Sequence, residues 1–406
     1  MLATLVPLFK EDMSVAAYSL YAQKENLFAN PLHLGTGAND GAGNIVGIEV
    51  INNISIDILT KDCDIIVPVN NISIYANISE QYCGPKNRIV ILLDSSIKPE
   101  KGYYERVKSL KQEGYKLAFN KLAVTKIEAY RQMLEYVDYF CVDCTSADPI
   151  KLGLICAKLL PGIPIVAENI PTQEIFEQLR DSKLFAMFEG EFYRVPINKK
   201  DTTISPLKMN YLKLLKIINT PNFDLTKVAA VISQDPAMTI SLLNIVNKLT
   251  LNSNISSIKQ ATALLGQKEL KRWLNTTIIS SLCSDRPNEI TRLSLIRARF
   301  AENLACVFGM KAKIEELFLM GLFSVLDYIM DKPMEEALSV IPVSQDIFSA
   351  LVKKEGVLSD IYRFLLSYEA GEWQEVSRQM ILKEINMESI YQAYVDSLKW
   401  YKNMFM

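Results

Sequence analysis

The chain has 406 residues, of which 49% are hydrophobic and 22% are charged. This length exceeds the roughly 250–300 residues at which a single core stops growing, so we expect two domains. The 44 basic and 46 acidic residues give a formal net charge of -2, which is not the basic excess that nucleic-acid polymers or acidic membranes attract.

The first residues, MLATLVPLFKEDMS, do not form a signal peptide. They lack a basic start, and Lys10, Glu11 and Asp12 interrupt the apolar run. No stretch reaches the 18 or so uncharged apolar residues of a membrane span. The seven cysteines are an odd number scattered over a long chain, a pattern typical of reduced thiols. We therefore expect a cytoplasmic protein with no membrane span.

The single histidine, His33, limits the metal sites that the chain can build. Sites that need two or more histidine ligands are excluded, and we expect a structural role for His33 beside its Gly-rich loop. That loop, LGTGANDGAGN at residues 34–44, lacks the Lys-Ser/Thr pair of a P-loop and the spacing of a dinucleotide fingerprint. It is interpreted as a connection at the rim of the first domain.

The first half alternates apolar runs with amphipathic segments, which predicts repeated strand-helix units. Eight such strands indicate a (β/α)8-type barrel with an irregular beginning, and a doubly wound open sheet is the alternative. Helices are predicted over 46–61, 103–113, 125–136, 149–160 and 172–181. The predicted strands are 4–9, 16–21, 65–69, 88–93, 115–119, 138–142, 163–167 and 184–188.

After Pro196 the polar run INKKDTTIS is a natural linker, so the predicted domains are 1–198 and 199–406. From Pro206 onward apolar residues recur at three- and four-residue spacing, which predicts an α-helical bundle without strands. The predicted helices are 207–218, 225–233, 237–248, 257–265, 269–282, 290–307, 314–330, 344–354, 359–368 and 383–404.

Polar residues close several predicted strands of the barrel. The carboxyl ends of parallel strands carry the chemistry in such folds, and converging carboxylates there can bind magnesium. Asp and Asn also follow strands simply as turn and cap residues. The stretch GYKLAFNKL adds an amide and a cation, Asn120 and Lys121, which are unusual metal ligands. The whole set is Asn70 or Asn71, Asp94, Asn120, Asp143, Glu168 and Glu189.

Cys141 and Cys144 form a CxxC pair, CVDC. A redox pair normally lies at a helix N-terminus, whereas Cys141 lies inside an apolar strand. One CxxC also supplies only half of a zinc site. We therefore expect neither redox chemistry nor zinc binding here.

The first half resembles an EAL domain, the barrel that in its active form hydrolyses cyclic di-GMP with two carboxylate-bound metal ions. The resemblance spans most of residues 1–196, and its landmarks are VAAYSLYAQ, VPVNNIS, RIVILLDSS, GYKLAFNKL, DYFCVD, VAENIPTQEIF and FEGEFYRVP. It implies that Ser19 replaces the signature glutamate and Leu92 a metal-binding glutamate, while Asn120 and Lys121 replace paired aspartates. Cys141 stands where a catalytic lysine is expected and Pro171 where a second glutamate is expected. Asp143, Glu168 and one of Asn70 and Asn71 are kept.

The second half resembles an HDOD domain, a helical relative of HD-type phosphohydrolases that lacks their metal-binding residues. The matching segments are SQDPAMTISLLNIVN and ISSIKQATALLGQKELKRW. In GLFSVLD, Ser324 and Val325 stand where a catalytic relative would have His-Asp. This half contains no histidine, so the resemblance implies that it cannot hold the metal of that superfamily.

These resemblances predict a bacterial-type EAL/HDOD signalling protein that is not an enzyme and has no catalytic, metal or cofactor-binding residues. The predicted function is scaffolding or regulation through an unidentified protein partner of the helical domain. An alternative is a catalytically inactive cyclic di-GMP sensor, with Gln23 near a position where the family often has arginine. A third is a weak metal-dependent phosphodiesterase. Homodimerisation stays open, because no surface pattern identifies an interface.

Overall fold

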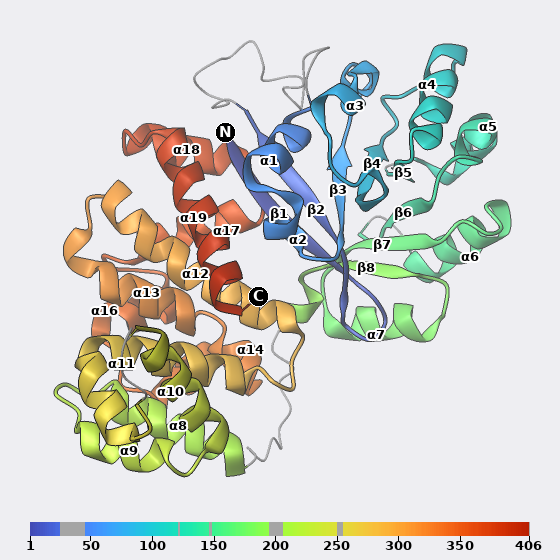
Figure 1. Cartoon of the computed structure of the whole chain (residues 1–406). Helices are drawn as coiled ribbons and strands as arrows, with labels where there is room; N and C mark the ends of the chain where they lie inside the picture. Colours follow the sequence, from blue (N-terminus) through green and yellow to red (C-terminus); the bar gives the residue numbers. More distant parts are fainter. Residues whose placement is uncertain (25–44, 121, 146–147, 195–205, 250–254, 406) are drawn as a thin grey trace. The chain divides into compact units, whose positions relative to one another are not determined.

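The computed structural model describes residues 1–24, 45–120, 122–145, 148–194, 206–249 and 255–405 (Figure 1). The chain forms two compact units. The barrel unit comprises Met1–Val195, Glu302–Ala312 and Arg363–Met406, and the helical unit comprises Pro196–Ala301 and Lys313–Tyr362. The first junction between the units lies between Val195 and Pro196, and two later segments return to the barrel unit, so the division of the domains at 198/199 stays a prediction.

Eight strands close into a barrel in the order β1 to β8. The neighbours from β2 to β8 are parallel, whereas β1 is antiparallel to both β2 and β8. The predicted barrel is confirmed, and the open doubly wound sheet is wrong because β1 closes the ring. The strands are β1 (Leu2–Phe9), β2 (Val15–Gln23), β3 (Asp64–Pro68), β4 (Ile89–Leu93), β5 (Lys116–Phe119), β6 (Tyr139–Asp143), β7 (Ile165–Ile170) and β8 (Met187–Gly190).

The strands are apolar along their length because both of their faces are buried, as in other parallel sheets with helical crossovers. One face packs against the surrounding helices. The other face forms a layer inside the barrel, to which each strand gives one residue. This interior layer consists of Leu8, Ala17, Ile66, Val90, Ala118, Cys141, Val166 and Met187.

The helices between the strands are mostly short, and two differ from prediction. The predicted helix 46–61 is broken at Ser55, where φ is 78°, and most of 125–136 is a 3₁₀ helix over Val124–Tyr130. The helices of this part are α1 (Val46–Ile54), α2 (Ile56–Thr60), α3 (Ile78–Gln81), α4 (Lys101–Gln112), α5 (Arg131–Leu134), α6 (Pro149–Leu159) and α7 (Gln173–Asp181).

The end of the chain packs on the start of the barrel. It contributes the last part of α17 (Ser359–Glu369), together with α18 (Trp373–Leu382) and α19 (Met387–Phe405). The backbone N–H of Ala3 donates to the hydroxyl of the fully buried Tyr368 at 3.3 Å. The amide of Gln23 donates to Ser377 in α18, also at 3.3 Å. Strands β1 and β2 are thereby covered by helices some 350 residues later in the chain.

The helical unit has no strand among its described residues. Gly266, with φ at 72°, kinks α11 between the two helices predicted there, and no helix in the described parts of the chain is long and apolar enough to cross a membrane. The helices are α8 (Pro206–Ile218), α9 (Leu225–Ile232), α10 (Pro236–Leu249), α11 (Ile258–Leu282), α12 (Asn288–Val307), α13 (Ile314–Phe323), α14 (Leu326–Met330), α15 (Met334–Ser339) and α16 (Gln345–Phe348), of which α12 ends in residues of the barrel unit.

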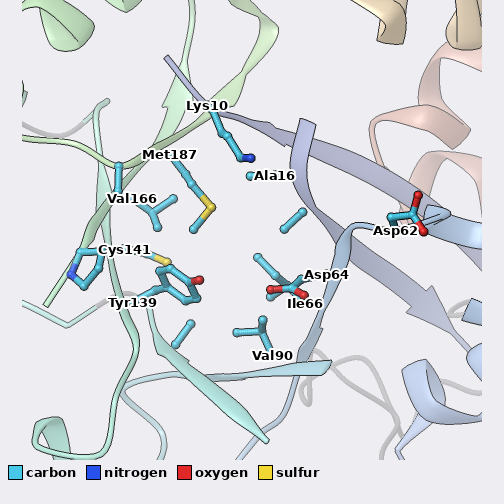
Figure 2. Close-up of a pocket in the computed structure, with 14 residues that line it drawn as sticks. Lys10, Ala16, Asp62, Asp64, Ile66, Val90, Tyr139, Cys141, Val166 and Met187 are labelled. Atoms are coloured by element: carbon cyan, nitrogen blue, oxygen red, sulfur yellow. The ribbon is translucent and has the colours of Figure 1, made fainter. Parts of the chain in front are cut away.

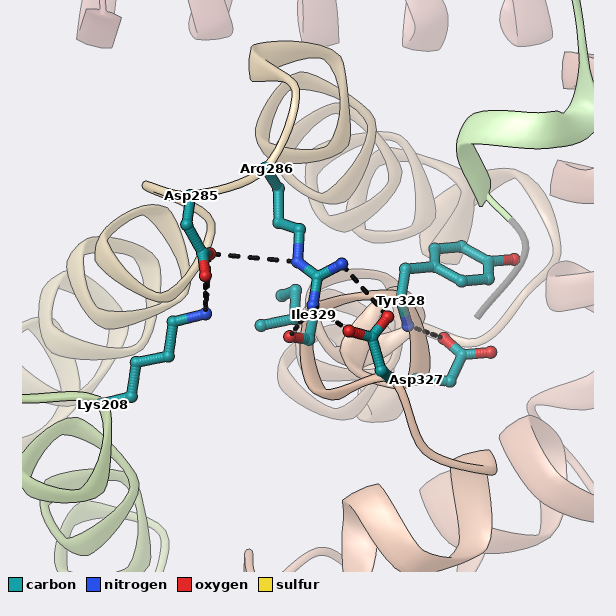
Figure 3. A network of polar contacts seen from close by, with 7 residues as sticks. Lys208, Asp285, Arg286, Asp327, Tyr328 and Ile329 are labelled. Carbon is teal, nitrogen blue, oxygen red and sulfur yellow. Dashed lines mark hydrogen bonds and ion pairs between the residues drawn. The ribbon is translucent and has the colours of Figure 1, made fainter. Parts of the chain in front are cut away.

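A largely buried ion pair joins the end of α11 to the end of α14 in the helical unit (Figure 3). Arg286 donates to both carboxylate oxygens of Asp331, at 3.1 and 2.6 Å, and to the carbonyl of Ile329 at 3.1 Å. Lys208 pairs with Asp285 at 2.6 Å on the outer side of the same network. The planar guanidinium therefore fixes two loop segments at once.

Arg286→Met should destabilise the helical unit by about 3 kcal/mol, because it leaves the carboxylate of Asp331 buried without its guanidinium. Chemical denaturation followed by circular dichroism measures the change. The control is Lys268→Gln, which removes an exposed ion pair with Glu315 and should cost less than about 1 kcal/mol. Equal losses of unfolding free energy in the two variants would contradict the conclusion that the Arg286–Asp331 pair stabilises the helical unit.

Candidate functional site

The candidate site lies at the carboxyl ends of the parallel barrel strands, which we call the barrel mouth. Asp143 at the end of β6 lies beside Glu168 in β7, and Glu189 follows in β8. Sequence reasoning named all three, and the barrel brings them to one end. In parallel barrels this end is where functional side chains gather.

A bulge between β7 and β8 sets the positions of the two glutamates. The register shifts between Ala167 and Ile170, and Asn169 adopts a left-handed conformation with φ at 60°. Its backbone N–H donates to Glu189 at 3.0 Å. Position 190 requires glycine, because the Cβ atom of any other residue would collide with the backbone of Ile170. Such a bulge redirects side chains beside a site.

Burial changes the acidity of groups at the mouth, above all that of Glu189. It raises the pKa of Glu189, and the charges of Glu191 and Asp143 act in the same direction, while the N–H of Asn169 and the charge of Arg194 oppose them. Burial and then the charges of Glu189 and Glu168 raise the pKa of Tyr21. Negative charge is thus costly at this end of the barrel.

The thiol of Cys141 lies below these carboxylates. It is buried, and burial, followed by the charge of Glu168 and a hydrogen bond with it, raises its pKa well above the usual value. Burial also raises the pKa of Cys144 to about 12. Both groups are therefore neutral thiols at pH 7, which argues against the thiolate that redox chemistry needs.

Other polar residues named from the sequence serve the turns in which they lie. Asn70 accepts the N–H groups of Ile72 and Ser73, at 2.8 and 2.7 Å. Asp94 accepts from the N–H of Ser96 at 2.8 Å. Asp143 likewise accepts from Thr145, at 2.9 Å from its N–H and 2.7 Å from its hydroxyl.

The residues present do not fit a two-metal centre. Ser19 is buried in β2, and Leu92 packs against the interior layer, so neither offers a carboxylate. Across the described ranges, no group of three or more His, Cys, Asp and Glu side chains is placed to hold a metal ion. Lys121, His33 and the Gly-rich loop lie outside the described residues. The absence of catalytic, metal and cofactor residues stays a prediction.

Two residues of the mouth, Tyr21 and Arg194, were missed by sequence reasoning, and Gln23 was named only for its place near a family arginine. Tyr21 interacts with the two glutamates. Arg194 pairs with Glu191 at 3.1 Å and with Glu369 of α17 at 3.7 Å. Gln23 is buried and its amide bonds Ser377, so it is engaged by α18. Only Tyr21 carried a usable signal, since it follows Ser19 with the two-residue period of a strand face.

In the helical unit, Ser324 occupies the position where the HD-type pattern would have histidine. It is buried, accepts from the guanidinium of Arg297 at 3.1 Å and donates to the carbonyl of Gly321 at 2.7 Å. Burial raises the pKa of the nearby Asp327 to about 6. Arg297 and Ser324 thus form a buried, structural hydrogen-bonded pair.

Comparison with known proteins agrees with both parts of this architecture. The HDOD domain family matches residues 204–341. Cyclic di-GMP phosphodiesterase CdgJ of Vibrio cholerae is 29% identical over 321 residues, which are 78% of this chain and 74% of that protein. The helical part of the chain therefore matches the HDOD family, while the EAL character of the barrel stays what the sequence resemblance implies. Another relative, the uncharacterized protein YuxH of Bacillus subtilis, is 25% identical over 98% of this chain and 97% of its own.

Two solved structures of EAL-type proteins also match. The EAL-like domain protein YdiV has a TM-score of 0.32 at 14% identity, over 46% of this chain and 88% of its own. The Bacillus subtilis YkuI protein, solved with cyclic di-GMP and calcium, has a TM-score of 0.35 at 14% identity, over 67% of this chain and 73% of its own.

The prediction that the protein is not an enzyme is contradicted by one of these relatives. CdgJ, which matches 78% of this chain, is named as a phosphodiesterase. The prediction rested on the loss of individual ligand positions, such as Leu92 and Ser19. It gave too little weight to the acidic side chains that the barrel still gathers at its mouth, above all Glu168 and Glu189.

Glu189→Gln should make the protein more resistant to heat at pH 8 and leave it little changed near pH 5. The folded pKa of Glu189 is raised, so folding favours the protonated acid, and stability falls as the pH rises above the unfolded value of about 4.3. Glutamine stays neutral throughout and avoids that loss. Thermal unfolding at both pH values measures the difference.

The control for this comparison is Glu177→Gln, which changes an exposed side chain of α7 that is not among the charges acting on Glu189. It should show no gain at pH 8. A loss of thermal resistance in Glu189→Gln at pH 8 would contradict the burial argument.

Proposed function

We propose that this protein is a cyclic di-GMP-responsive signalling protein, in which the barrel mouth binds the dinucleotide and the helical unit acts on a protein partner. The observation that carries the proposal is the largely buried cation Arg194, which acts on Glu189 at the mouth of the closed barrel. The name of CdgJ supports cyclic di-GMP as the ligand.

The charge of the mouth dictates how such a ligand would bind. Cyclic di-GMP carries two phosphodiester charges, and carboxylates at the mouth repel them. The raised pKa of Glu189 reduces that repulsion by keeping the acid protonated to a higher pH. Arg194 lies close enough to act on Glu189 and provides a fixed positive charge. Binding should therefore improve as the pH falls.

Helix α17 offers a route from the mouth to the helical unit along the chain itself. Its first residues, Ser359–Tyr362, belong to the helical unit, and its last residues belong to the barrel unit. Glu369 at its end pairs with Arg194 at 3.7 Å, and both side chains are only 12% exposed. A ligand that draws Arg194 toward phosphate would weaken this pair and thereby alter the end of α17.

Calorimetric titration of the full chain with cyclic di-GMP tests the proposal. We expect tighter binding at pH 6 than at pH 8, and Glu189→Gln should bind about tenfold more tightly at pH 8, equivalent to roughly 1.4 kcal/mol of removed repulsion. The matched control is Glu177→Gln on the exposed side of α7, which should bind like the wild type. Absence of binding at both pH values would overturn the proposal.

Hydrolysis of cyclic di-GMP is the second candidate function, favoured by the name of CdgJ. The same titrated samples, analysed by chromatography for the linear dinucleotide, distinguish the two. Turnover that Glu168→Gln and Glu189→Gln abolish would favour the enzyme. Binding without product would favour the sensor.

The protein partner has to be sought with the full chain. A fragment of residues 201–406 would separate Glu302–Ala312 and Arg363–Met406 from the barrel that they pack on. Capture of partners by the full chain, with and without cyclic di-GMP, asks whether the ligand changes what the protein binds.

A further inference from the structure

The barrel contains a mainly apolar cavity at the end opposite its mouth. A cavity of about 390 Å³ opens between the amino ends of the parallel strands (Figure 2). Asp64, Tyr139 and Met187, which begin β3, β6 and β8, line it together with Lys10 and Cys141. We call it the amino-end cavity. The volume falls within the range of roughly 300–1,000 Å³ that holds small organic ligands.

The cavity exists because the interior layer of the barrel is built partly from small residues. Barrel interiors of this type are normally filled by bulky branched side chains. Here Ala17, Ala118 and Cys141 occupy three of the eight strand positions in the layer, and Ala16 and Ala186 extend the space toward the surface. Ile66, Val90 and Val166 supply apolar walls. The result is an apolar chamber with an opening rather than a filled core.

The turn between β1 and β2 places the exposed residue Lys10 at the opening. The N–H of Lys10 donates to the carbonyl of Ser14 at 2.8 Å, and the N–H of Met13 donates to the carbonyl of Lys10 at 3.1 Å. Asp12 completes the turn by accepting the hydroxyl of Ser14 at 2.6 Å. Figure 2 shows the Lys10 ammonium directed toward the space beside Met187 and Ala16. Among the described residues, no ion pair or hydrogen bond satisfies this ammonium group.

The other charges around the cavity largely cancel. Asp64 forms an ion pair with Lys116, so that carboxylate is already neutralised. Asp62 remains as one negative charge at the rim. Tyr139 provides a hydroxyl group, and burial raises its pKa, so it remains a hydrogen-bond donor at pH 7. The cation and the donor suit a single anionic group, whereas the remaining charge of Asp62 opposes a multiply charged ligand such as a phosphate dianion.

We propose that the amino-end cavity binds a small organic monoanion with an apolar body, whose anionic group contacts Lys10 and whose body packs on Val90, Ala118 and Val166. This site is separate from the mouth and does not depend on the function proposed there. Cys141 lies between the two, since its side chain lines the cavity and its thiol bonds Glu168 at the mouth.

Two fluorescent probes of nearly the same shape test the site in the full chain. Anilinonaphthalene sulfonate carries an anionic group on an apolar body, and phenylnaphthylamine has the same body without the charge. We expect the sulfonate to bind the wild type more tightly than the neutral probe does. Lys10→Gln should lower the affinity for the sulfonate about tenfold, because one charge-assisted contact is lost. The affinity for the neutral probe should change by no more than about twofold. Lys151→Gln, on the exposed face of α6, is the matched control.

Ala118→Leu tests the chamber itself, because its side chain extends into the space and should abolish binding of both probes. Circular dichroism checks that this variant folds, and Lys10→Gln decides the matter if it does not. Failure of the wild type to bind the sulfonate, or sulfonate binding unchanged by both variants, would overturn the site and leave the cavity as a packing void. If Lys10→Gln lowered the affinity for both probes equally, the proposal that the ligand is a monoanion would be overturned.

Discussion

The antiparallel strand β1 is the constraint on which the barrel depends. Without it, β2 and β8 would present open edges, and exposed strand edges are prone to pair with other chains. Leu8 and Phe9 pair with Glu189 and Phe188 on one side, while the whole of β1 pairs with β2 on the other. The same strand is covered by the end of the chain, through Ala3 and Tyr368. The same strand therefore both closes the sheet and contacts the C-terminal helices.

Closure also determines the chemistry at both ends of the barrel. A closed ring forces inward side chains into a small volume of low polarity, where charge is costly unless it is paired. At the mouth this constraint favours protonated Glu189 and a neutral Cys141 thiol. At the amino end the cost of a partly buried charge is reduced by pairing, because Asp64 and Lys116 neutralise each other. The two ends consequently suit different ligands, even though one residue layer separates them.

The sequence predicted local features of the fold far better than its closure. All eight strands were recognisable as apolar runs, because buried parallel strands need apolar residues on both faces. Helix α18 was missed: its buried positions, such as Val376 and Met380, lie among charged residues and pack on distant strands. Nor could any local pattern reveal that residues 302–312 and 363–406 belong to the barrel unit. Those contacts join residues hundreds of positions apart.

The candidate site shows the same limit. Glu168 and Glu189 were found because they close predicted strands. Asn70 and Asp94 also follow predicted strands, but their side chains accept hydrogen bonds from backbone N–H groups of their own turns. The two glutamates differ from these turn residues because they flank the bulge at Asn169, a backbone feature that could not be predicted from the sequence. The role of Arg194 depends on a contact with α17 that only the folded chain creates.

That contact gives the order of domains along the chain a physical meaning. The helical unit is not simply appended after the barrel, since the chain leaves the barrel unit after Val195, returns to it for Glu302–Ala312 and returns again within α17. A change in the pairing of Arg194 with Glu369 acts on a helix whose other end belongs to the helical unit. An appended domain would be connected to the barrel by a single segment of chain. Here the chain passes between the two units four times, at 195/196, 301/302, 312/313 and 362/363.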